Sequence, residues 1–122
     1  MILGFKKSMG FKEKILNFSK KHTIREDKHD RWKQGRMIQF AYGVRTKQFE
    51  KFAEMPCLGI QKIEIKHKFD AISIRVDGKL LDENSIVELS RNDGFDTIVD
   101  FLAWFNKDFE GKIIHWTNHV RY

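Results

Sequence analysis

Short runs in which apolar and polar residues alternate predict that β-strands form most of this chain. Such alternation is typical of strands because successive side chains point to opposite faces of a sheet. An Asp-Gly pair at 77–78 adds a strong signal for a two-residue hairpin turn. The expected strand regions are residues 2–5, 22–25, 37–43, 58–69, 71–81 and 112–120.

Apolar residues at helical spacing predict three short helices. The second helix is expected over residues 83–91. The first and third carry apolar stripes, formed by Phe11, Ile15 and Phe18, and by Ile98, Phe101, Leu102, Phe105 and Phe109. A residue suited to capping precedes each helix, namely Ser8, Asp82 and Asp96. Residues 45–55 leave two alternatives, a short helix or an irregular segment.

The order of these elements predicts an α+β fold. We expect a small mixed or antiparallel β-barrel, flanked by two to four short helices, because many short strands favour partial closure. Alternating strand–helix–strand units of a parallel fold are absent from the pattern. The length of 122 residues fits one domain, 1–122.

Composition narrows the class of protein. Hydrophobic residues make up 41% of the chain, enough to close one core. The single cysteine, Cys57, allows no internal disulfide, fits a reducing compartment and is expected to be a buried thiol. The apolar start becomes charged after five residues, and no run is long enough to span a membrane. We therefore expect a cytoplasmic protein without a membrane partner.

Charge is spread unevenly along the chain. The net charge is +6, yet residues 1–61 hold 14 Lys and Arg against 6 Asp and Glu, a net +8. A basic half of this kind indicates an anionic partner, with nucleic acid as the first candidate. A basic surface that serves only solubility is the alternative.

A cationic cluster surrounds a hydroxyl in the second predicted strand. Thr23 and Arg25 share one strand face, Lys21 joins them if the strand extends backward, and Lys20 lies at the helix–strand junction. Such a group suits a phosphate or oxyanion, and a lysine beside a threonine can activate the hydroxyl as a nucleophile. The residues alone favour the other interpretation, a solvated strand.

Two further segments carry candidate chemistry. In "RWKQGR" (31–36), Trp32 either stacks on a base while Arg31, Lys33 and Arg36 meet phosphates, or packs on the barrel. Asp93 in "NDGF" is either a turn residue, which the sequence favours, or a carboxylate that points at the basic strand.

His115 and His119 are too far apart along a strand to share a metal readily, so we expect no metal and no cofactor.

The segments "KKHTIRED" with "RWKQGRMIQF", and "NDGFDTIVDFLAWF" with "GKIIHW", together resemble the ASCH family, which has a PUA-like fold. The resemblance covers roughly residues 2–42 and 90–117 and implies a PUA-like barrel. The chain is similar in particular to small bacterial amidohydrolases of this family that act on acetylated cytidine. Carried over by position, it implies a catalytic set of Lys20, Thr23 and Asp93, where the family has Glu in place of Asp93.

Two hypotheses about function follow. The first is an RNA- or nucleotide-binding module in which Trp32 stacks on a base and cations meet phosphate; these cations are Lys20, Lys21, Arg25, Arg31 and Arg36. The second is an amidohydrolase of an acylated nucleoside that uses Lys20, Thr23 and Asp93. Exposure of Trp104 and Trp116 would instead favour a protein-interaction module.

Overall fold

Eight strands and three α-helices form the fold in a computed structural model that describes all residues 1–122, which confirms the α+β class. The strands are β1 (Ile2–Phe5), β2 (His22–Arg25), β3 (Met37–Tyr42), β4 (Glu50–Pro56), β5 (Gly59–Lys68), β6 (Ala71–Val76), β7 (Lys79–Leu80) and β8 (Phe109–His115). The helices are α1 (Phe11–Leu16), α2 (Glu83–Asn92) and α3 (Ile98–Trp104), with a 3₁₀ turn, η1 (Lys7–Met9), before α1.

The strands divide between two sheets, so the barrel expected from the sequence is not found in closed form. One sheet has the order β1-β3-β4, and the other has the order β2-β8-β5-β6-β7. Only β1 and β3 pair in parallel. No backbone pairing joins the edge strands β1 and β2; a hydrogen bond from the Arg25 guanidinium to the Gly4 carbonyl oxygen, 2.7 Å long, links them instead.

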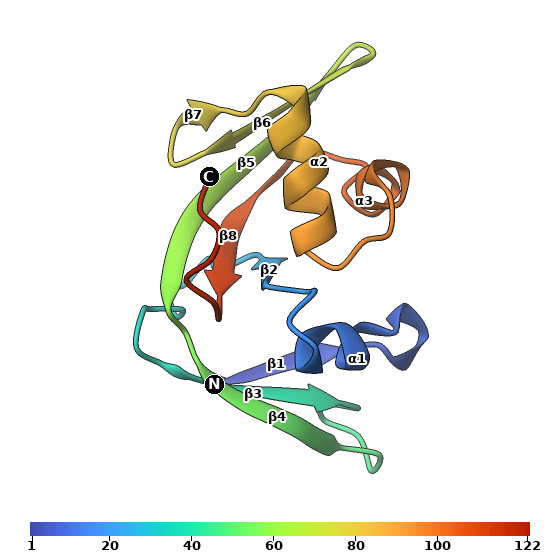
Figure 1. The fold of residues 1–122 in the computed structure, drawn as a ribbon, viewed down its shortest axis with the longest axis vertical. Coiled ribbons are helices and arrows are strands. Elements are labelled where there is room, and N and C mark those ends of the chain that lie inside the picture. The colour runs from blue at the N-terminus through green and yellow to red at the C-terminus, as the bar shows by residue number, and fades with distance from the viewer.

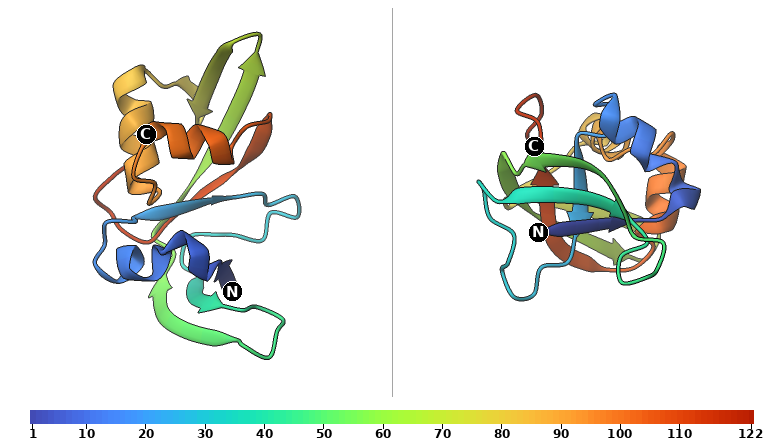
Figure 2. Two further views of the ribbon diagram at one scale, coloured as in Figure 1. Left: turned by 90° about the vertical axis from the view of Figure 1, so that its right-hand side faces the viewer. Right: turned by 90° about the horizontal axis from the view of Figure 1, so that it is seen from below.

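Three layers of the molecule are visible in Figure 1. The three-stranded sheet lies at the bottom with α1 beside it, while α2 and α3 lie together on one side of the five-stranded sheet. The chain passes from β4 into β5 as one long curved path between the two sheets. The left view of Figure 2 shows β2, the edge strand of the five-stranded sheet, directly above the N-terminal segment with α1.

Local chemistry explains several boundaries that the sequence predicted. Asp77 and Gly78 have φ values of 50° and 81°, the left-handed conformations that a tight β6–β7 hairpin requires. Asp82 caps α2 by accepting a hydrogen bond from the Ser85 backbone N–H. Cys57 is buried, as expected. No helix is long and apolar enough to cross a membrane.

Three predicted details at the helix ends are wrong. Ser8 caps no helix, because Gly10 adopts a left-handed φ of 66° and α1 begins only after it. Phe18 also has a positive φ and is half exposed, so it leaves the apolar stripe of α1. The cap of α3 is Thr97, whose hydroxyl accepts from the Asp100 N–H, while Asp96 pairs with Lys14.

Two predicted segments also differ from the structure. Residues 45–55 contain no helix: β4 occupies most of them because its backbone pairs with β3, with Ala53 opposite Phe40. The last strand, expected over 112–120, is β8 at 109–115. Its longer start pairs with β5, where Phe109 lies opposite Ile65. In both cases pairing with a distant strand decides the conformation, which local sequence does not encode.

Candidate functional site

Lys20 is the most deeply buried cation of the predicted cluster, with 1% of its surface exposed. Its ammonium donates a hydrogen bond to the backbone carbonyl of Asp93 and lies 3.6 Å from the Asp93 carboxylate Oδ1. The same ammonium lies 4.3 Å from the centroid of the Phe11 ring, a cation–π distance. Burial lowers the pKa of Lys20 to about 8, although the Asp93 charge opposes this shift.

Asp93 is a buried carboxylate at the break between α2 and α3, and it points toward the basic strand. It caps the end of α2, and Gly94 follows with a φ of 97°, a conformation that side chains disfavour. A Cβ at Gly94 would come within 3.0 Å of the Lys20 side chain and the Phe11 ring. The "NDGF" turn therefore uses its glycine both for the bend and for the close approach of Lys20.

Thr23 lies in the middle of β2, opposite Ile114 of β8, and is 5% exposed. No other protein group hydrogen-bonds to its hydroxyl, which lines a small pocket. Arg25, two residues along the same strand face, lines the pocket as well. The guanidinium of Arg25 lies 5.0 Å from the centroid of the Phe5 ring, so it is held between β1 and β2.

The pocket has a volume of about 250 Å³ and brings Lys20, Thr23, Arg25 and Asp93 together. The cationic segment and the "NDGF" bend thus meet at one cavity, although about seventy residues separate them in sequence. Most of the remaining wall is apolar or aromatic and is formed by Gly4, Phe5, Lys6, Met9, Phe11, Ile24, Phe95, Trp104 and Phe105. An apolar pocket with a few convergent polar groups is the usual form of a small-ligand site.

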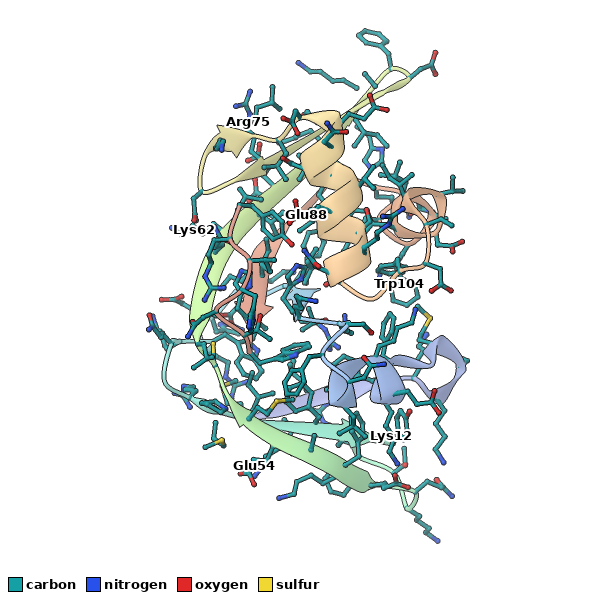
Figure 3. All side chains as sticks on the ribbon, viewed as in Figure 1. Lys12, Glu54, Lys62, Arg75, Glu88 and Trp104 are labelled. Carbon is teal, nitrogen blue, oxygen red and sulfur yellow. The ribbon has the colours of Figure 1, made fainter.

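Trp104 supplies a half-exposed indole at the edge of this pocket. Its side chain extends from α3 toward the N-terminal segment (Figure 3). There the Lys6 ammonium lies 5.6 Å from the centroid of the Trp104 ring. Its exposure agrees with the sequence-based expectation, but its position is beside the pocket. Trp116, also expected to be exposed, is buried against Phe40.

A polar chain behind Asp93 was not predicted from the sequence. His22 Nδ1 lies 3.1 Å from Asp93 Oδ1, and His22 Nε2 lies 2.8 Å from the Tyr122 hydroxyl. Asn92 donates to that hydroxyl over 3.0 Å. The Tyr122 proton is then free to point at Nε2, which leaves Nδ1–H to donate to Asp93. Burial lowers the pKa of His22, which favours this neutral form.

Three of the predicted cations lie outside the pocket. Lys21 donates to the Phe18 carbonyl oxygen at the surface, because Lys21 and Thr23 do not continue one regular strand face. Arg31 and Arg36 are exposed residues of the β2–β3 loop, and neither contributes to the pocket wall. The loop carries them away from the cavity, so the structure does not bring them together with Thr23.

Trp32 cannot stack on a base as the first hypothesis required, since it is 6% exposed and belongs to the hydrophobic core. Its backbone N–H donates to Asp27 Oδ2, which also pairs with Lys112. The charged residues around Trp32 thus fix the loop that buries it. Packing on the fold, the alternative interpretation, is confirmed.

Comparison with known proteins gave no support for any family. No family model matched the chain, and neither curated proteins nor solved structures gave a match. The ASCH resemblance therefore remains a prediction made from motifs. No group of three or more His, Cys, Asp or Glu side chains is placed to hold a metal ion.

Proposed function

We propose that this chain is an ASCH-type, PUA-like domain that hydrolyses an acylated nucleoside, with acetylcytidine as the model substrate. The observation that carries the proposal is the convergence of Lys20, Thr23 and Asp93 on one pocket. A free hydroxyl, a buried amine and a carboxylate are the groups that acyl transfer by a threonine requires. The aromatic wall suits a planar base.

In this proposal Thr23 Oγ1 attacks the acyl carbonyl carbon. Lys20, whose pKa of about 8 leaves a share of neutral amine near neutral pH, accepts the hydroxyl proton. The same proton passes to the departing amino group of the base, and the acyl group stays on Thr23 as an ester. Water, deprotonated by Lys20, then hydrolyses the ester and restores the hydroxyl.

Asp93 serves as the group that fixes the Lys20 amine. Its backbone carbonyl and its carboxylate both face the Lys20 ammonium. Arg25 lies on the Thr23 side of the pocket as a second cation and provides positive charge for the oxyanion that develops on the carbonyl oxygen.

Hydrolysis of acetylcytidine by purified protein, followed as acetate release, tests the proposal. The matched pair of variants is Thr23→Val, which keeps the shape, and Thr23→Ser, which keeps the hydroxyl. We expect turnover by the wild type, at least a hundredfold loss in Thr23→Val and partial activity in Thr23→Ser. Undiminished turnover in Thr23→Val would remove Thr23 from the mechanism.

Binding without chemistry, to RNA or a nucleotide, is the second candidate. The observation in its favour is that Asp93 already holds the Lys20 ammonium, so the amine is not free until it loses its proton. The net charge of +8 over residues 1–61 also favours an anionic ligand. Binding to RNA that weakens steeply with added salt, with no acetate release, would favour this candidate.

A further inference from the structure

A second hollow adjoins the candidate pocket. It has a volume of about 620 Å³ and lies between the start of η1 and the β3–β4 turn. Gly4, Phe5 and Lys6 line both cavities, so the two are contiguous at the end of β1. Together the two cavities form a longer surface, of which the second hollow is the part more open to solvent.

The charged side chains that line the second hollow are all cationic. Lys6 and Lys7 line it, and no Asp or Glu does. Neither lysine belongs to an ion pair; the Lys7 ammonium lies 5.5 Å from the centroid of the Tyr42 ring, which also lines the hollow. The adjacent β3–β4 turn carries two more exposed cations without a salt bridge, Arg45 and Lys47, but neither lines the cavity. Two unpaired cations, Lys6 and Lys7, therefore line the hollow.

The other large cavity of the molecule has a different character. It measures about 590 Å³ and is lined by acidic and basic residues in similar numbers, so their charges largely offset each other. Lys112 in its wall is already paired with Asp27. The uncompensated positive charge is thus a property of the hollow beside the candidate pocket and not of every cavity.

The turn that borders the hollow is fixed by its own contacts. The Thr46 hydroxyl donates to the Gly43 carbonyl oxygen over 2.7 Å. Gly43 has a φ of 61°, and a Cβ there would come within 2.6 Å of the Gln48 backbone oxygen. The part of the turn that lines the hollow, Val44, Thr46 and Gln48, is therefore ordered before an anion binds, which reduces the entropy lost on binding.

We propose that this hollow is a phosphate subsite, and that the ligand of the pocket is a nucleotide and not a free nucleoside. The proposal rests on the proposed function, because it assumes that the base occupies the pocket with Thr23. Lys6 lies at the boundary, near both Trp104 and the hollow, and so contacts the sugar–phosphate side of a base held in the pocket. Lys7, which also lines the hollow, then pairs with the phosphate.

An NMR titration of the wild-type protein with cytidine and with cytidine 5′-monophosphate locates the subsite. Neither ligand carries an acyl group, so nothing is consumed. We expect both to shift the backbone signals of residues 23–25 and 93–95. Only the monophosphate should also shift residues 6–8 and 43–48, with about tenfold tighter binding at low salt, a gain that two or more exposed cations can supply.

The matched variants are Lys7→Gln and, as a control of equal charge change, Lys68→Gln at the far end of β5. Lys7 lines the hollow and not the candidate pocket, and both side chains are exposed, so each variant should keep the fold. Lys7→Gln should remove most of the preference for phosphate and leave cytidine binding unchanged, while the control should alter neither. A phosphate preference that persists unreduced in Lys7→Gln, or no preference in the wild type, would overturn the phosphate subsite.

The source of the phosphate is decided by a third ligand, a short single-stranded oligocytidylate. Binding equal to that of the monophosphate indicates a free nucleotide, and much tighter binding indicates RNA. Failure of the proposed hydrolysis can be distinguished from failure of the phosphate subsite. Acetate release can be absent while the phosphate preference persists. Conversely, acetylcytidine can be hydrolysed by a protein that shows no phosphate preference.

Discussion

His22 Nδ1 lies 3.1 Å from Asp93 Oδ1. The His22 side chain is on one face of β2, and the Thr23 side chain is on the other. Asp93 therefore has two partners from the same short segment: Lys20 on the pocket side and His22 behind it. The Tyr122 hydroxyl orients His22 from the other end. Contacts on both sides therefore fix the Asp93 carboxylate. Such support is expected if the position of Asp93 sets the position of the Lys20 amine.

The first prediction concerns the Tyr122 hydroxyl. Tyr122→Phe leaves His22 Nε2 buried without a donor, so we expect a loss of about 1–2 kcal/mol in the free energy of unfolding. Tyr42→Phe is the control, because Tyr42 is buried but its hydroxyl has no hydrogen bond in the protein, so the loss of that hydroxyl should change little. Urea denaturation of both variants provides the comparison. Equal effects would show that the Tyr122–His22 hydrogen bond contributes nothing.

The second prediction concerns the Lys20 amine at alkaline pH. Its pKa is 10.5 in the unfolded chain and about 8 in the folded protein, so the unfolded state binds more protons between these values. The contribution of Lys20 to stability should therefore rise between pH 8 and pH 10, by about 1 kcal/mol per pH unit. Lys20→Met should remove this slope. A wild type and a variant with parallel pH profiles of unfolding free energy would contradict the lowered pKa.

A third prediction concerns acid. Burial lowers the pKa of His115 to about 3, below its usual 6.5, so the unfolded state takes up the proton first as the pH falls. Stability should decrease from about pH 6.5 downward as far as pH 3. His115→Gln keeps a donor for the Gln61 Oε1, which accepts a hydrogen bond from His115 Nε2 over 3.0 Å. Thermal unfolding from pH 7 to pH 4 should show a shallower decline in this variant than in the wild type.

The fourth prediction separates packing from backbone strain at the "NDGF" turn. Gly94→Ala combines a left-handed φ with a Cβ only 3.0 Å from Lys20, so we expect a loss of about 2–4 kcal/mol. Gly10→Ala has a similar positive φ but nothing within 4 Å, so about 1 kcal/mol is expected. Denaturant unfolding gives both values. A Gly94 effect no larger than that of Gly10 would show that Lys20 does not pack closely against the turn.

The sequence predicted the elements whose signal is local. Asp77–Gly78 specified the hairpin because its turn requires left-handed residues, and Asp82 specified the start of α2 through its cap. Residues 45–55 were different, because their strand forms only by pairing with β3. A closed barrel would also need backbone pairing between the edges of the two sheets, which no local pattern encodes; at β1 and β2 the hydrogen bond from Arg25 to Gly4 is the link instead.

The candidate site was partly accessible from sequence for the same reason. Lys20 and Thr23 lie close together in a recognisable motif, and the resemblance linked them to Asp93. No motif in the sequence indicates a role for His22, and Tyr122 lies one hundred residues away from it. Only the fold shows that these two residues hold Asp93. Burial, and not the neighbouring charges, decides which indole a ligand can reach: Trp32 lies in the core, whereas Trp104 lines the pocket.

A crystal structure of the Thr23→Val variant soaked with acetylcytidine tests the central claim most directly. The account predicts the acylated base in the pocket between residue 23 and Asp93, with its ring against the aromatic wall near Trp104 and its acyl carbonyl next to residue 23. An empty pocket at a saturating ligand concentration, or a ligand bound only elsewhere on the surface, would contradict it.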